Sequence, residues 1–101
     1  MNIHVSLHAI DQYRARRTNR RGKVAVERDI QEMVGKVIES GRLLSHRPDD
    51  FVLFGRKRSS KALPAGQWFA PCGDIGFILK RDGKRWIVVT MLTRSGARYA
   101  A

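Results

Sequence analysis

The chain has 101 residues, of which 43% are hydrophobic, so it has room for one domain and enough apolar side chains for a folded core. Twenty lysines and arginines against nine acidic residues give a formal net charge of +11, which attracts polyanions, nucleic acid first among them. An anionic membrane or an acidic protein is the alternative partner.

Several classes of protein are excluded by simple features. No apolar run approaches the ~20 residues of a membrane span, and the N-terminal MNIHVSL lacks the basic start and long apolar stretch of a signal peptide. Cys72 is the single cysteine, which rules out an internal disulfide and a cysteine-based zinc site. We therefore expect a cytoplasmic protein without a membrane partner.

Met1 to Val5 reads as a lead-in or a brief strand, and a helix is predicted from there to about Arg17. Ser6 suits the N-cap position, because its hydroxyl can accept from an amide of the first turn. His8 projects nearly opposite the apolar stripe of this helix. That stripe consists of Leu7, Ile10 and Tyr13, whereas Asp11, Gln12 and Ala15 lie beside the histidine.

A second helix is predicted over about Ala25 to Ser40, because apolar residues recur at helical spacing. Gly41 is a credible stop for this helix. Gly35 in its interior costs roughly 1 kcal/mol relative to alanine, unless it permits closer packing. The apolar face consists of Val26, Ile30, Met33, Val34, Val37 and Ile38.

After Gly41 the pattern becomes that of short strands. Residues 42–46 and 50–54 read as strands with a turn at 47–49, and residues 64–71 read as a strand or an ordered loop. The resulting fold class is α+β, with two N-terminal helices packed on one face of an antiparallel sheet of three to five strands.

The clearest local signal is a hairpin of residues 75–81 and 84–92 around the turn Asp82-Gly83. That turn predicts that Leu79 opposes Trp86 and that the strands are apolar on both faces. Thr90 and Thr93 then face opposite ways unless a bulge intervenes, so only one of them can line an open site. One face is predicted to carry Ile75, Phe77, Leu79, Trp86, Val88, Thr90 and Leu92, and the other Ile78, Ile87, Val89, Met91 and Thr93.

Basic side chains form three clusters in the sequence. They indicate either a nucleic-acid-binding surface or ordinary solvated surface charge. Arginine matches phosphate geometry and each neutralised phosphate releases counterion, so we expect nucleic-acid binding. Trp68 is either a base-stacking residue beside the second cluster or a core aromatic. The clusters are Arg14, Arg16, Arg17, Arg20, Arg21 and Lys23; Arg56, Lys57, Arg58 and Lys61; and Lys80, Arg81, Lys84 and Arg85, the last being the weakest candidate.

His8 is the candidate general acid or base, with a surface histidine as its alternative explanation. Asp11 and Gln12, one turn on, would orient its ring. Arg98 and Tyr99 are a second suggestive pair, because cleavage by a 2′-hydroxyl needs proton transfer and a cation for the phosphorane charge. The His, Asp and Glu spacings predict no metal site, and no cofactor is expected.

A helix carrying H-A-x-x-x-Y-R-x-R, a second helix ending in S-G-R and a strand ending in I-V-V-T-M-L-T resemble small phage and bacterial proteins. Through them the chain resembles the metal-independent RNase superfamily of barnase, EndoU, colicin and RelE-type toxins. This resemblance to ribonucleases is what favours RNA over DNA as the expected nucleic acid. The resemblance implies catalytic positions at His8, Arg14, Arg16 and either Thr90 or Thr93, with Arg98 and Tyr99 echoing the C-terminal residues of RelE-type toxins.

Two functions follow as hypotheses. One is a toxin-like metal-independent endoribonuclease, and the other is a non-catalytic phage-type inhibitor that binds nucleic acid or a host nucleic-acid-handling protein. A host protein or an antitoxin is accordingly a second expected partner. The catalytic hypothesis sets a structural condition: the first helix must pack at the edge of the sheet for His8 to reach a site there.

Overall fold

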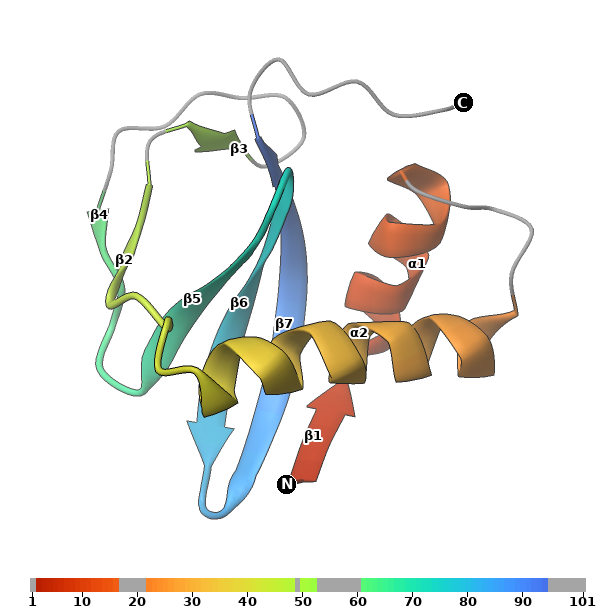
Figure 1. Cartoon of the computed structure of the whole chain (residues 1–101), viewed down its shortest axis with the longest axis horizontal. Coiled ribbons are helices and arrows are strands. Elements are labelled where there is room, and N and C mark those ends of the chain that lie inside the picture. Colours follow the sequence, from red (N-terminus) through yellow and green to blue (C-terminus); the bar gives the residue numbers. More distant parts are fainter. Residues whose placement is uncertain (1, 17–21, 49, 53–60, 95–101) are drawn as a thin grey trace.

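The computed structural model describes residues 2–16, 22–48, 50–52 and 61–94. They form an α+β fold in which the helices α1 (Leu7–Arg16) and α2 (Lys23–Glu39) lie near the N-terminus, as predicted (Figure 1). The strands are β1 (Asn2–Val5), β2 (His46–Arg47), β3 (Phe51–Val52), β4 (Lys61–Ala62), β5 (Gln67–Cys72), β6 (Ile75–Asp82) and β7 (Arg85–Arg94).

The main sheet has the strand order β1-β7-β6-β5, and β3 also pairs with β7. The prediction of an antiparallel sheet is wrong at one edge, because β1 runs parallel to β7 while β3, β5 and β6 are antiparallel to their neighbours. Parallel strands need a long crossover, and the chain between β1 and β7 supplies one that includes both helices. In the described ranges no helix is long and apolar enough to cross a membrane.

Local sequence signals place both helices well. Ser6 Oγ accepts from the amide of Ala9 at 3.1 Å, so the predicted N-cap of α1 is confirmed. Helix α2 begins two residues before the prediction and ends at the predicted stop, where Gly41 has a φ of 71°. The amide of Gly41 donates to the carbonyl of Ile38, which closes the last turn.

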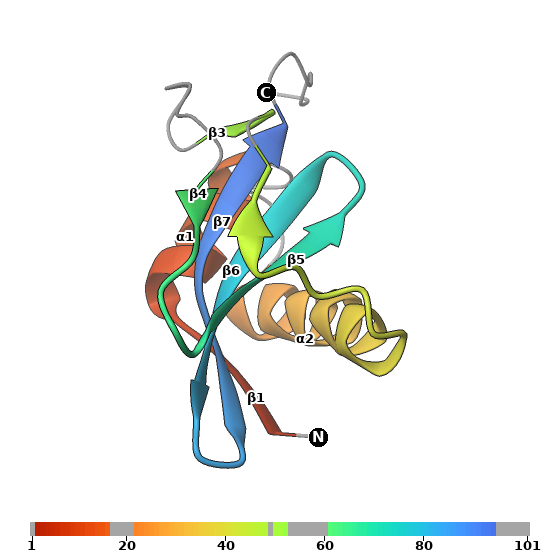
Figure 2. The same ribbon diagram turned by 90° about the vertical axis from the view of Figure 1, so that its left-hand side faces the viewer.

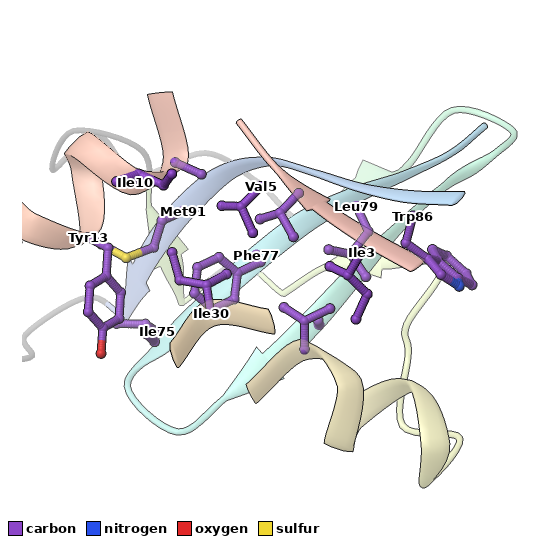
Figure 3. Packing of buried hydrophobic residues seen from close by; sticks show 14 of the residues in the cluster. Ile3, Val5, Ile10, Tyr13, Ile30, Ile75, Phe77, Leu79, Trp86 and Met91 are labelled. Carbon is purple, nitrogen blue, oxygen red and sulfur yellow. The ribbon is translucent and has the colours of Figure 1, made fainter. Parts of the chain in front are cut away.

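The main core lies between the helices and one face of the sheet (Figure 3). Figure 2 shows α2 on that side of the sheet. A smaller cluster occupies the other face, where the rings of Phe51 and Phe69 pack edge to face at 4.8 Å against Leu92. The hairpin β6–β7 is therefore covered on both faces near its middle, which agrees with its apolar sequence.

The predicted hairpin register is wrong. Asp82 pairs with Arg85, so the two loop residues are Gly83 and Lys84, and Gly83 takes the positive φ of 61° that the first loop position requires. Leu79 consequently opposes Val88 instead of Trp86.

A β-bulge then changes the faces of β7. Leu79 pairs with Val88 but Ile78 pairs with Thr90, which leaves Val89 as the extra residue. Met91 and Thr93 consequently lie on the helix side, opposite Phe77 and Ile75, and Thr90 and Leu92 lie on the other side. Thr90 and Thr93 still face opposite ways, but each on the face opposite to the prediction.

The region after α2 is less regular than predicted. Of residues 42–46, His46 alone belongs to a strand, β2, which continues to Arg47 and pairs with β4. Of residues 50–52, Phe51 and Val52 form β3, which pairs with β7. Residues 49, 53 and 54 lie outside the described residues. Leu44 forms an isolated bridge to Phe69 of β5. Residues 64–71 were expected to form a strand or an ordered loop, and most of them belong to the strand β5. Burial of Phe51 against Phe69 accounts for the departure of β3 toward β7.

Candidate functional site

A pocket of about 360 Å³, lined mainly by polar residue types, lies between helix α1 and the last residues of β7. We call it the α1–β7 pocket. The α1 residues recur every three to four positions, which places them on one face of the helix. The lining consists of His8, Asp11, Gln12, Ala15 and Arg16 from α1, with Met91 and Thr93 from β7.

The pocket exists because α1 occupies part of the outer edge of β7. Strand β1 pairs with residues 85–88 of that edge, and β3 pairs with residues 93–94. Between them, Ser6 Oγ donates to the carbonyl of Val89 at 2.9 Å, and Gln12 Oε1 accepts from the amide of Met91 at 2.9 Å. The side chains of Ser6 and Gln12 therefore satisfy the strand edge that β1 and β3 leave open. Figure 1 shows α1 beside this edge of β7.

This placement meets the condition that the sequence set for His8. The inner side of α1 buries Ala9, Ile10 and Tyr13 in the core. Tyr13 lies close to Met91 there (Figure 3). The polar side is left at the edge of the sheet, where His8 faces the same pocket as Arg16 and Thr93. The predicted apolar stripe differs in one residue, because Leu7 is 65% exposed.

The remaining predicted catalytic residues do not line the pocket. Thr90 donates its hydroxyl to Gln12 Oε1 at 2.7 Å, so Thr93 is the late-strand threonine that faces the cavity. Arg14 lies outside the lining, and its Nε is buried without a hydrogen-bond partner among the described residues. Arg98 and Tyr99 lie outside the described residues.

The predicted nucleic-acid-binding residues fall mostly outside the described ranges. Lys23 is exposed as the first residue of α2. Trp68 is half-buried, packs on the main core and contacts Trp86 edge to face at 5.3 Å, which favours the core alternative. Lys61 belongs to β4, but its side chain is not among those described; Arg17, Arg20, Arg21, Arg56, Lys57 and Arg58 lie outside the described residues altogether.

The third basic cluster is exposed at the tip of the β6–β7 hairpin. The guanidinium of Arg81 lies 4.5 Å from the ring centre of Trp86, and its Nε donates to the carbonyl of Gly83 at 2.9 Å. Arg85 pairs with Asp82 at 3.0 Å. Lys80 and Lys84 add two further exposed cations, so the tip is a positive surface.

A second cavity of about 380 Å³ lies between β1 and α2, and its charges balance. Its lining contains two cations and two glutamates, and Gln31 Nε2 in its wall already donates to the carbonyl of Ile3 at 2.9 Å. Because its lining includes no histidine, it is the weaker candidate for proton-transfer chemistry. Its lining is Ile3, Arg28, Gln31, Glu32, Gly35, Lys36 and Glu39.

The single cysteine, Cys72, lies outside the lining of both cavities. Burial raises the pKa of the Cys72 thiol to about 11, although the positive charge of Arg42 opposes the rise. Across residues 2–16, 22–48, 50–52 and 61–94, no group of three His, Cys, Asp or Glu side chains is arranged to hold a metal ion.

Gln12 makes contacts that the sequence did not suggest. The helical spacing of Asp11 and Gln12 to His8 was the available signal, and it led only to the expectation that both residues orient the imidazole ring. The contact of Gln12 with Thr90 and Met91 was not predicted, because it depends on where α1 meets the bulged strand.

The described residues thus define a mixed α+β fold with the α1–β7 pocket at the edge of its sheet. Comparisons of the chain with protein-family models, curated proteins and solved structures found no match.

Proposed function

We propose that this protein binds RNA and cleaves it in the α1–β7 pocket. The observation that carries the proposal is the convergence of His8, Asp11 and Arg16 on one cavity beside Thr93. An imidazole, a carboxylate and a guanidinium are together sufficient for proton transfer and for stabilisation of an anionic transition state. The net charge of +11 favours a polyanionic substrate.

The proposed reaction is attack of the ribose 2′-oxygen on the adjacent phosphorus. The Asp11 carboxylate accepts the 2′-hydroxyl proton while protonated His8 donates a proton to the 5′-oxygen. The bond between phosphorus and the 5′-oxygen breaks, which leaves a 2′,3′-cyclic phosphate and a 5′-hydroxyl. Arg16 stabilises the additional negative charge of the phosphorane, because a guanidinium can bond two phosphate oxygens at once.

This chemistry selects RNA over DNA, since the nucleophile is the 2′-hydroxyl itself. Binding outside the pocket is supplied by exposed cations such as those at the β6–β7 tip, which contact phosphates without reading sequence. Binding is accordingly expected to weaken steeply with salt.

The test is cleavage of a labelled RNA oligonucleotide in the presence of EDTA, with identification of the 2′,3′-cyclic phosphate product. His8→Gln is expected to lower the rate at least about 100-fold, and Arg16→Gln similarly. The matched controls are His4→Gln, at an exposed residue of β1, and Arg42→Gln, at an exposed arginine after α2; both lie outside the pocket and away from the β6–β7 tip.

Two results would overturn the catalytic proposal. One is intact RNA at high protein concentration, and the other is cleavage that is insensitive to His8→Gln. Salt-sensitive RNA binding without any cleavage would instead support the non-catalytic alternative, a module that binds nucleic acid or blocks a nucleic-acid-handling protein.

A further inference from the structure

The side-chain amide of Gln12 has a defined orientation. Its Oε1 accepts from the backbone amide of Met91 at 2.9 Å and from the hydroxyl of Thr90 at 2.7 Å. A backbone N–H can only donate, so the atom that faces it must be the amide oxygen and not the nitrogen. The nitrogen is therefore directed away from the backbone of β7.

The amide nitrogen of Gln12 is left available to a ligand. Among the described residues this nitrogen has no hydrogen-bond partner. It is not a buried unsatisfied atom either, because Arg14 Nε is the only such side-chain atom in the described residues. Gln12 itself lines the α1–β7 pocket with His8 and Arg16. Gln31 shows the contrasting case, because its amide nitrogen is already bonded to the carbonyl of Ile3.

We infer that the α1–β7 pocket binds a phosphate group and that Gln12 Nε2 is one of its hydrogen-bond donors. The inference deepens the proposed function, on which it rests for the choice of phosphate. Oxyanions accept from several donors at once, and here a preoriented amide lies beside a guanidinium in a half-enclosed cavity. Gln12 thus acts as a phosphate-binding residue rather than as the ring-orienting residue expected from the sequence.

The donors and the acceptor in the pocket require different groups on the ligand. Gln12 and Arg16 can only favour an acceptor, whereas the Asp11 carboxylate repels an anion and accepts from a hydroxyl. A phosphate with a neighbouring hydroxyl satisfies both requirements. This combination is present in a ribonucleotide and absent from inorganic phosphate, so a ribonucleoside 3′-monophosphate is expected to bind more tightly than the free ion.

The experiment is a titration of the ¹⁵N-labelled protein with inorganic phosphate and then with a ribonucleoside 3′-monophosphate at constant ionic strength. The side-chain amide resonances of Gln12 are expected to shift saturably, and those of Gln31 to stay unchanged. Gln12→Glu is the sharpest variant, because a carboxylate still accepts from Met91 and Thr90 but replaces the donor by a negative charge. It is expected to weaken binding of the monophosphate about 10-fold or more.

Gln67→Glu is the matched control, since it makes the same change of charge on β5, away from the pocket. An affinity that falls equally in both variants, or a Gln12 amide that does not respond to either ligand in the unmodified protein, would overturn the inference. The second readout needs no variant and so does not depend on whether Gln12→Glu folds. Phosphate binding through Gln12 without RNA cleavage would overturn the proposed catalysis and leave this inference intact.

Discussion

The hydroxyl of Thr90 donates a hydrogen bond to Oε1 of Gln12 across 2.7 Å, joining residues that lie 78 positions apart in the chain. The bond connects α1 to β7 at the residue that follows the bulge at Val89. Bulges commonly redirect side chains beside functional sites, and this one leaves Thr93 facing the pocket while Thr90 holds the pocket wall.

Thr90→Val is expected to lower the free energy of unfolding by about 1 kcal/mol, because Gln12 Oε1 loses one of its two donors. Chemical denaturation measures this change. Thr93→Val is the matched variant: Thr93 faces the pocket, so its loss should affect binding of the ribonucleoside monophosphate more than stability. The assignment would be contradicted if Thr90→Val left stability unchanged while Thr93→Val lowered it.

Ser6→Ala should destabilise the protein by about 1–2 kcal/mol. The Ser6 hydroxyl caps α1 through the amide of Ala9 and also donates to the carbonyl of Val89, so both bonds are lost together. Urea unfolding followed by circular dichroism provides the measurement. Ser45→Ala, at an exposed serine outside the helices, is the control and should change stability by less than about 0.5 kcal/mol; equal effects would contradict the role of Ser6.

Gly76→Ala is expected to cost about 3 kcal/mol. A Cβ at this position would lie 2.1 Å from Cζ of Phe69, whose ring is fully buried and cannot move aside cheaply. A drop in the thermal midpoint, with loss of the near-ultraviolet signal of the packed aromatic residues, would report the change.

Gly35→Ala provides the opposite case within the same chain. The added Cβ meets only Cδ1 of Ile3, at an ordinary 3.7 Å, in the interior of α2. The substitution should therefore stabilise the protein by up to about 1 kcal/mol through helix propensity. Destabilisation instead would show that α2 requires glycine for close packing.

Cys72 should react slowly with iodoacetamide at pH 8. Only the thiolate is nucleophilic, and a rise in pKa from 9.0 to about 11 lowers its fraction about 100-fold relative to the unfolded chain. Alkylation in guanidinium supplies the reference rate, and equal rates in the folded and unfolded protein would contradict the burial of this thiol.

The same thiol makes stability depend on pH. Above pH 9 the unfolded thiol ionises while the folded one stays protonated, so the contribution of Cys72 to stability is complete below pH 9 and is lost as the pH rises toward 11. Urea unfolding of the unmodified protein and of Cys72→Ala at pH 8 and pH 10.5 isolates this contribution. The free energy of unfolding of the unmodified protein should fall relative to that of Cys72→Ala when the pH is raised from 8 to 10.5.

Features that depend on neighbouring residues could be predicted from the amino-acid sequence. The Ser6 cap, the apolar spacing of α2, the stop at Gly41 and the existence of the β6–β7 hairpin follow from contacts within a few positions, so they could be predicted. The class α+β and the polar side of α1 that carries His8 and Arg16 follow from the same local patterns.

Local sequence patterns could not predict the direction of β1, the register of the hairpin or the composition of the pocket. These depend on contacts across the chain: the pairing of β1 with β7, the extra residue Val89, and the bonds from Gln12 to Thr90 and Met91. A one-residue change in a strand reverses every side chain that follows, and nothing in the local sequence marks where the bulge falls. The bulge therefore leaves Thr93 and not Thr90 facing the pocket. The contacts of Gln12 with Thr90 and Met91 fix the orientation of its side-chain amide.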